Sequence, residues 1–314
     1  MTARSREERL RLVAAFAAVY VIWGSTYLAI RYAIATIPPY LMASARFASA
    51  GAVLLALARL RGGAWPTRRQ WGVALISGAL LLAGGIGGVC WAEQRVPSGL
   101  AALIAGAGPL VTVVVDWLRP GGTRPDPTTT AGLVLGFAGV ALLIDPGATD
   151  AARIAPAGAL VLVCSVLSWA TGTVFAKHVR GAPSRLMGSG ASMLMGSAVL
   201  LVMATALGET SGFSPSRVGA GSLLALAYLA AFGSVVAFTA YFWLIQHTTP
   251  AQATTYAYVN PVLALLLGWA VAGEPVTARV VLAAGVIVSG VLVVTALPHA
   301  RARLAARVAG TTRS

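Results

Sequence analysis

Charged residues are scarce in this sequence, and acidic residues are the scarcest. Of 314 residues 10% are charged, and only 9 are Asp or Glu, whereas ordinary soluble domains carry about 25% charged residues. Hydrophobic residues make up 58% of the chain. A soluble protein of this size could not bury so much apolar surface in one core. The composition therefore excludes an ordinary soluble protein.

Residues that bind metals or carry out catalysis are also few. The two cysteines, Cys90 and Cys164, lie in apolar segments, form no metal-binding spacing and are not expected to pair as a disulfide. The three histidines, His178, His247 and His299, fall at the ends of expected helices or in a tail. No metal constellation can be built from them, and no nucleotide-binding motif is present. We expect no metal, no cofactor and no ATP-driven cycle.

Long apolar runs fill most of the chain instead. A helix that crosses a bilayer needs about 20 apolar residues, at about 1.5 Å per residue. Clusters of Pro, Gly and charged residues divide the sequence into runs of this length. The sequence predicts an all-α membrane protein with ten transmembrane helices, at 12–34, 40–60, 70–92, 98–118, 129–145, 157–177, 185–207, 219–244, 250–271 and 277–297.

Basic residues are distributed unevenly between alternate connections. The net charge of +14 does not indicate nucleic-acid binding, because the cations lie in short segments between apolar runs, as the positive-inside rule describes. Five occupy one set of connections: Arg31, Arg95, Arg153, Arg217 and Arg279. Seventeen occupy the other set, together with both termini: Arg4, Arg6, Arg9, Arg11, Arg59, Arg61, Arg68, Arg69, Arg119, Arg124, Lys177, Arg180, Arg185, Arg301, Arg303, Arg307 and Arg313. We therefore predict that both termini are cytoplasmic, including basic tails at 1–11 and 298–314.

The chain also contains two copies of one pattern. Trp23 and Arg31 recur as Trp169 and Lys177, both 146 residues later. A second set recurs 152 residues later: Trp91, Gln94 and Pro109 match Trp243, Gln246 and Pro261. Gly139-Val140 recurs as Gly290-Val291 after 151 residues. These offsets predict two five-helix repeats, 12–145 and 157–297. Because five is odd, the second repeat enters the membrane from the opposite side, which is the inverted architecture of alternating-access carriers.

Three segments resemble a known family. These are "WGSTYLAIRYA…PPYLMASARF", "WAEQRVPSGLAALIAGAGPL" and "YAYVNPVLALLLGWAVAGEPVT…GVIVSGVLV", and they resemble the EamA-type branch of the drug/metabolite transporter superfamily over about residues 12 to 297. The resemblance implies a ten-helix bacterial inner-membrane carrier, often an exporter of amino acids, related metabolites or toxic organic compounds. It also implies a central cavity lined by helices 1, 3, 4, 6, 8 and 9. The second half departs from the pattern in its sparse polar residues.

Two arginines lie within the first two apolar segments. Arg46 lies about six residues into the second expected helix, roughly 9 Å deep, where a charge must pair or face water. Two interpretations stay open: a clamp on helix-end carbonyls, or a ligand for a substrate carboxylate in the cavity. Arg31 and its counterpart Lys177 lie nearer helix ends, so we interpret them as interfacial anchors.

Aromatic and hydrogen-bonding side chains share faces of the expected helices. Trp23 and Tyr27 are four residues apart, as are Trp169 and Thr173 on the matching helix, and this spacing puts each pair on one face. Both tryptophans are mid-span, where interfacial aromatic belts do not occur. The sequence therefore favours an aromatic cavity that holds a flat or amphiphilic solute. With Arg46, the candidate substrate-binding residues are Trp23, Tyr27, Trp91, Trp169, Thr173, Tyr241, Trp243, Tyr256 and Asn260.

Three carboxylates could couple transport to protons. Glu93 has Arg95 beside it, Asp116 lies close to Arg119, and Glu274 lies in the "GEPVT" turn. We interpret all three as structural.

Taken together, these patterns predict a secondary transporter. The resemblance implies, further, an exporter of small metabolites such as amino acids or amphiphilic drug-like compounds in a bacterial inner membrane. The alternatives are a membrane-embedded enzyme and a channel or scaffold without a transport cycle. The first would need clustered acid and histidine groups inside the spans, and the second would not need inverted repeats. The expected partners are a small-molecule substrate and the lipid bilayer, with no nucleic acid, and the protein is expected to be a monomer or a homodimer.

Overall fold

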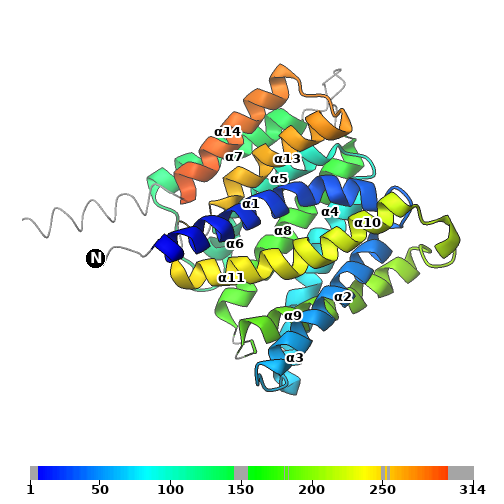
Figure 1. Cartoon of the computed structure of the whole chain (residues 1–314). Helices are drawn as coiled ribbons and strands as arrows, with labels where there is room; N and C mark the ends of the chain where they lie inside the picture. Colours follow the sequence, from blue (N-terminus) through cyan, green and yellow to red (C-terminus); the bar gives the residue numbers. More distant parts are fainter. Residues whose placement is uncertain are drawn as a thin grey trace, which may run out of the picture.

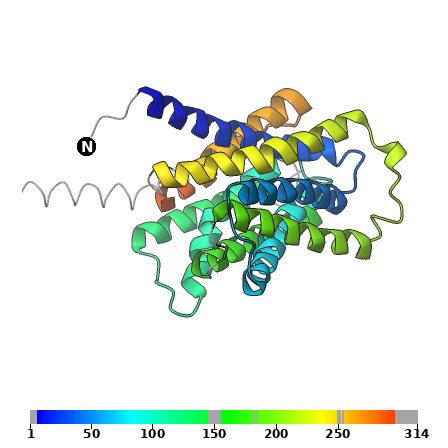
Figure 2. The ribbon, with the colours of Figure 1, turned by 60° about the horizontal axis from the view of Figure 1, so that its bottom comes forward.

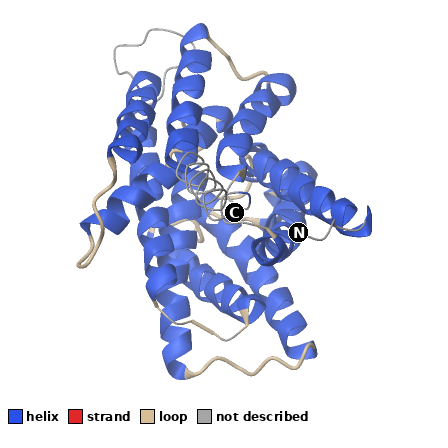
Figure 3. Ribbon diagram, turned by 90° about the vertical axis from the view of Figure 1, so that its left-hand side faces the viewer, coloured by secondary structure: helices blue, strands red, loops and turns tan. Residues whose placement is uncertain are grey.

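The computed structural model describes residues 6–144, 155–179, 181–182, 184–248, 252 and 255–295, so most of the predicted basic tails lie outside the described residues. Within these ranges the chain forms helices and connections and no strand (Figure 3). The elements are α1 (Arg6–Ala33), α2 (Pro39–Leu60), α3 (Arg68–Ser77), η1 (Gly78–Gly87), α4 (Gly88–Ala92), α5 (Ser98–Gly106), α6 (Gly108–Leu118), α7 (Pro127–Ile144), α8 (Pro156–His178), α9 (Arg185–Ala206), η2 (Pro215–Arg217), α10 (Ala220–Tyr228), η3 (Leu229–Val236), α11 (Ala237–His247), α13 (Tyr256–Ala272) and α14 (Ala278–Thr295).

Among the described residues, eight helical stretches are long and apolar enough to cross a membrane by length and composition. Two shorter apolar helices, Pro127–Leu143 and Tyr256–Ala272, fall where two further spans are expected. Large apolar side chains are exposed on the outer surface, among them Val202 at 67%, Leu224 at 71% and Leu160 at 64%. Such a surface suits hydrocarbon rather than water. The protein is therefore an all-helical, multi-pass membrane protein, as the composition predicts.

Local sequence signals explain where helices begin and end. Three of them, α2, α7 and α8, begin with a proline, whose missing amide proton costs nothing in a first turn. Thr67 and Gln70 form a reciprocal capping box at the start of α3. Gly273 ends α13 with a φ of 64°, a left-handed conformation that glycine adopts without steric cost. These signals lie at the predicted breaks.

Equivalent helices of the two halves match in length and pack against one another. Helices α2 and α9 both have 22 residues, and α7 and α14 both have 18 residues. The first and last residues of α2 and α9 are related by the same offset as Trp23 and Trp169. The first and last residues of α7 and α14 are related by the same offset as Gly139 and Gly290. Helix α2 packs along α9 and α7 packs along α14 (Figure 1).

Glycines allow both close approaches. A Cβ atom on Gly51 of α2 would lie 2.9 Å from Gly190 O of α9. In the other pair of helices, a Cβ atom on Gly139 of α7 would lie 2.8 Å from Ile287 N of α14. Small residues let membrane helices approach in this way.

The contacts between these helices also exchange under the same offsets. Under the offset that relates α2 to α9, Gly51 corresponds to Ser197 and Gly190 corresponds to Ser44. These two serines are also in contact, because Ser44 Oγ donates a hydrogen bond to Ser197 O at 2.8 Å. Under the offset that relates α7 to α14, Gly139 corresponds to Gly290 and Ile287 corresponds to Gly136. These two glycines are also in contact, because a Cβ atom on Gly290 would clash with the Gly136 backbone. Both helix pairs therefore keep the same contacts when the copies are exchanged.

Two π-helical segments occupy equivalent places in the two halves. Segment η1 lies between α3 and α4, and η3 lies between α10 and α11. Their first residues, Gly78 and Leu229, are related by the same offset as Gly139 and Gly290. In a π segment the hydrogen bonds run from i to i+5, and such segments are rare and often mark functional sites. No periodicity in the sequence predicts them.

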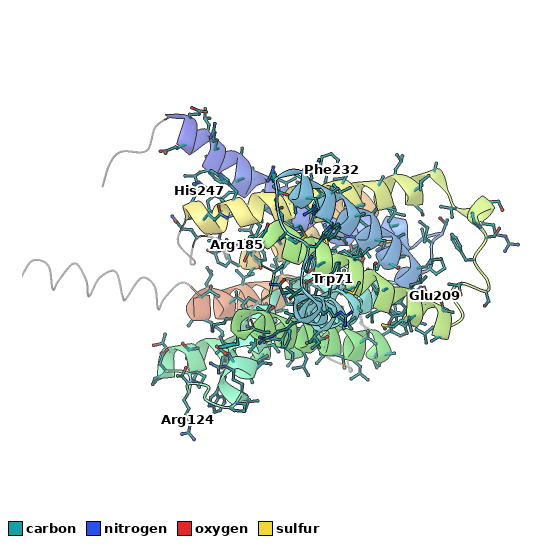
Figure 4. The ribbon with its side chains drawn as sticks, turned by 90° about the horizontal axis from the view of Figure 1, so that it is seen from below. Trp71, Arg124, Arg185, Glu209, Phe232 and His247 are labelled. Carbon is teal, nitrogen blue, oxygen red and sulfur yellow. The ribbon has the colours of Figure 1, made fainter. Side chains whose placement is uncertain are left out.

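Helix connections gather at two opposite ends of the molecule. We call one the Glu274 end: Glu274 contacts Arg31 and Ser98, Glu209 Oε2 accepts from Leu41 N at 2.9 Å, and Thr36 Oγ1 accepts from Gly219 N. The other is the Asp116 end, where Asp116 contacts Lys177 and Gln70 donates to Gly181 O. Figure 2 shows the N-terminal end of α1 on the left and the 207–219 connection on the right. Figure 4 likewise shows Arg124 and His247 on one side and Glu209 on the other.

Candidate functional site

Four aromatic rings from three helices form one cluster. Trp23 of α1 lies with its ring centroid 5.3 Å from Phe238, 5.2 Å from Tyr241 and 4.9 Å from Tyr256, and the two tyrosine rings are 5.5 Å apart. The arrangements are edge-to-face or tilted, as ring quadrupoles prefer. Helix α1 lies between α13 and α11 (Figure 1), which is why the three helices can share one cluster. Three predicted site residues, Trp23, Tyr241 and Tyr256, therefore meet.

Arg46 is buried beside this cluster and contacts the π segment η3. Its side chain is buried, and its Nε donates to Ser234 Oγ at 2.9 Å. Trp23 Nε1 donates to Gly233 O at 3.1 Å, so the tryptophan and the arginine meet at neighbouring residues of η3. A Cβ atom on Gly233 would lie 3.2 Å from both Arg46 Nη2 and Thr26 Cγ2. Glycine at this position lets the guanidinium approach the backbone.

Arg46 therefore does not point to a lipid interface. No backbone carbonyl among the described residues accepts a hydrogen bond from it, and its guanidinium carbon lies 4.9 Å from the Phe47 ring centroid. Its Nη1 is buried and has no hydrogen-bond partner among the described residues. A buried donor without a partner costs free energy unless a ligand or water supplies an acceptor.

The acidic residue Glu93 and the predicted site residue Asn260 also have buried oxygens without hydrogen-bond partners among the described residues. Both carboxylate oxygens of Glu93 and Oδ1 of Asn260 have no hydrogen-bond partner in the described structure. Glu93 lies at the C-terminal end of α4 and is buried. Arg46 Nη1 is a buried donor and the Glu93 oxygens are buried acceptors, so a solute with both an acceptor and a donor would satisfy them.

The expectation that Glu93 contacts Arg95 is wrong. Arg95 donates to Gln94 Oε1 at 3.1 Å, and its guanidinium lies 4.1 Å from the Trp91 ring centroid. A signal for Glu93 was present in the repeat: Gln94 and Trp91 have matching counterparts, whereas Glu93 corresponds to Ile245. Arg46 breaks the repeat in the same way, since its counterpart in α9 is Ser192.

The other predicted residues lie around this region or away from it. Tyr27 packs against the buried cluster that contains Leu100 and Leu103. Trp169 packs against Gly85 of η1, much as Trp23 packs against η3. Thr173 is exposed and donates to Trp169 O at 2.8 Å. Trp243 stacks on His247 with centroids 4.1 Å apart. The structure does not bring Thr173 or Trp243 to the aromatic cluster.

The helix-end cations that were interpreted as interfacial anchors form two ion pairs. Arg31 Nη1 pairs with Glu274 Oε1, and the same carboxylate accepts from Ser98 N and Ser98 Oγ, both at 2.8 Å, and from Gly99 N at 2.9 Å. Lys177 Nζ pairs with Asp116 Oδ2 at 2.9 Å. The expected contact between Asp116 and Arg119 is confirmed, at 2.6 Å.

Comparison with known proteins agrees with this architecture. The EamA-like transporter family matches residues 10–145 and again residues 156–296. The uncharacterized inner membrane transporter YedA of Escherichia coli K12 is 40% identical over 91% of each chain. The uncharacterized transporter YvbV of Bacillus subtilis is 26% identical over 86% of each chain. A crystal structure with 23% identity covers 92% of this chain and 98% of its own with a TM-score of 0.61, which concerns the fold alone. The chain belongs to the EamA-like transporter family.

Proposed function

We propose that this protein is a secondary exporter of small metabolites, such as amino acids or amphiphilic drug-like compounds. Transport would occur by alternating access around a midplane cavity between two inverted five-helix repeats, 12–145 and 157–297. The observation that carries the proposal is the meeting of Arg46 and Trp23 at Gly233 and Ser234, beside an aromatic cluster and unpaired buried polar atoms. Structural packing alone does not require such atoms.

Three features support the inverted repeat. The equivalent helices match in length, their mutual contacts exchange under the same offsets, and both copies carry a π segment in the third helix of the repeat. An axis in the membrane plane would relate two such copies, as in other carriers built from inverted repeats.

The charge distribution supports an orientation in the bacterial inner membrane. The connections at the Asp116 end contain Arg59, Arg61, Arg68, Arg119 and Arg124, whereas few basic residues lie at the Glu274 end. By the positive-inside rule the Asp116 end faces the cytoplasm, together with both termini. The named relative from Escherichia coli is an inner membrane transporter, which agrees with this assignment.

The site supports a solute with a carboxylate, a hydrogen-bond donor and an apolar part. Arg46 Nε is already bonded to Ser234, so the end of the guanidinium fork is left for a carboxylate. Glu93 would accept from an ammonium group or another donor on the same solute. The rings of Trp23, Tyr241 and Tyr256 would hold its apolar portion. Tyr27, Asn260, Trp91 and Trp169 complete the proposed lining, and Thr173 and Trp243 are its weakest members.

Transport by the purified protein in ATP-free proteoliposomes tests the proposal. The panel would contain amino acids, carboxylates that lack an ammonium group, and amphiphilic cations, each measured for efflux and uptake against empty liposomes. We expect at least one carboxylate-containing solute to move faster than in empty liposomes, with no added nucleotide. Movement of no solute in the panel, by protein that is folded in the membrane, would contradict the proposed substrate class.

A further inference from the structure

Two ion pairs join the halves of the protein at opposite ends. Arg31 of the first half pairs with Glu274 of the second, and Asp116 of the first half pairs with Lys177 of the second. Glu274 binds the first residue of the Ser98–Leu118 span, whereas Asp116 lies in the last turn of the same span, which has 21 residues. At helical rise the two sites are about 27 Å apart, nearly the thickness of a bilayer core.

The two pairs occupy equivalent places in the repeat. Arg31 and Lys177 are counterparts under the offset that relates Trp23 to Trp169. The offset that relates Pro109 to Pro261 relates Asp116 to Gly268. Gly268 has no side chain, but a Cβ atom built there would clash with Oε2 of Glu274. The Glu274 carboxylate therefore fills the space that corresponds to the Asp116 side chain.

The carboxylates of Glu274 and Asp116 have further hydrogen-bond partners in addition to the cation on the other helix. Glu274 is held by the amides of Ser98 and Gly99 and by Ser98 Oγ, at the beginning of α5. Asp116 is held by Arg119, one helical turn along the chain. Each carboxylate therefore keeps hydrogen bonds when its partners on the other helix move away, which are Arg31 of α1 for Glu274 and Lys177 with the nearby His178 of α8 for Asp116. Neither separation would leave a buried charge without any partner.

We propose that these ion pairs are matched gates that close opposite ends of the transport path and open in alternation. Separation of α1 from Glu274 opens the Glu274 end, and separation of α8 from Asp116 opens the Asp116 end. The inference deepens the proposed alternating-access function and rests on it. It assigns a transport role to four charged residues whose sequence context indicates only interfacial anchors and structural carboxylates.

The burial of the two pairs differs, and this difference sets which gate opens more easily. The side chains of Lys177 and Asp116 are 64% and 30% exposed, whereas that of Glu274 is 3% exposed and that of Arg31 is 40% exposed. Exposed ion pairs contribute little because water and salt screen them. The Asp116 gate is therefore the easier one to open, and the resting protein favours access from that end.

Two-sided thiol labelling tests the gates without knowledge of the substrate. Cys90 and Cys164 are first replaced by alanine, and Thr26→Cys supplies a reporter next to Arg46 and Gly233. A membrane-impermeant maleimide is applied to right-side-out and inside-out vesicles, and the ratio of the two labelling rates is measured. Because Glu274 is buried, Arg31→Gln should shift the ratio about tenfold toward the Glu274 side. Lys177→Gln should shift it about two- to fivefold toward the Asp116 side.

Control variants keep the test specific. Arg11→Gln removes an exposed pair with Glu7 inside one helix and should leave the ratio unchanged. Arg31→Lys and Lys177→Arg keep the charges and should return the ratio toward that of the reporter protein, which a folding defect would not do. Opposite shifts support the gates even if the solute panel yields no substrate. Shifts in the same direction, or no shift in either gate variant, would overturn them.

Discussion

Replacement of Arg46 tests the proposed substrate contact. The guanidinium is buried, donates through Nε to Ser234 Oγ at 2.9 Å, and leaves Nη1 without a partner in the described part of the chain. A hydrogen bond to a charged group contributes about 1.5 to 3 kcal/mol. Two parallel bonds to a substrate carboxylate would then contribute about 3 kcal/mol or more, because charged pairs with this geometry are among the strongest.

Arg46→Ala should lower the transport efficiency for carboxylates by about 100-fold or more, which for most assays is complete loss. Arg46→Lys keeps the charge but loses the planar fork, so we expect a loss of about tenfold. Initial efflux rates from proteoliposomes, normalised to folded protein, measure both effects. Arg59→Ala is the matched control, because Arg59 lies near the other end of α2, is exposed and donates to Gly63 O.

Solutes with and without a carboxylate should respond differently to the loss of Arg46. Solutes without a carboxylate should be transported by Arg46→Ala at rates near those of the unmodified protein. If purified Arg46→Ala transports carboxylates at the normal rate, the ligand role is wrong, and Arg46 serves only to connect α2 with η3 through Ser234.

Glu93→Gln should reduce transport of solutes that carry both an ammonium and a carboxylate more than transport of simple carboxylates, and equal losses in the proteoliposome panel would count against a donor contact. Gly290→Leu should destabilise the protein by about 1 to 3 kcal/mol because α7 and α14 touch there, whereas Gly285→Leu on the same helix meets open space; thermal unfolding in detergent compares them. A reporter fused to the C-terminus should be active on the cytoplasmic side, and periplasmic activity would contradict the helix count. Hydrogen bonds from Thr129 and Thr128 lower the pKa of Asp126. The stabilisation that Asp126 gives to the start of α7 is therefore present at neutral pH and is lost as the pH falls from about 4 through the lowered pKa. Asp126→Asn should remove this part of the acid dependence of thermal unfolding.

The ends of the helices could be predicted from the sequence because they depend on local signals. Apolar length, prolines and turn residues set the boundaries of α2, α9 and α14 to within a few residues of the expected spans. The shared faces of α1 and α13 also follow from helical spacing, which is why Trp23 and Tyr256 were predicted in one site and lie together. Such features depend on neighbouring residues along the chain.

Contacts between distant segments could not be predicted in the same way. Arg31 was interpreted as an anchor because it lies near a helix end, yet Glu274, 243 positions away, supplies a partner. The partner of Arg46 is a serine on a π segment, and no periodicity indicates either the serine or the change in hydrogen bonding. The expected contact between Glu93 and Arg95 is wrong for a related reason, because Arg95, its neighbour in sequence, turns toward Trp91 instead.

Trans-stimulation in proteoliposomes tests alternating access most directly. Liposomes that contain the purified protein are loaded with a labelled solute from the panel, and its efflux is measured with and without the same unlabelled solute outside. A carrier that exposes one site to the two sides in turn should release the labelled solute faster when unlabelled solute is present outside, because the loaded protein returns more readily than the empty one. Efflux that is unaffected by external solute, and that is not saturable, would contradict the account and indicate a channel.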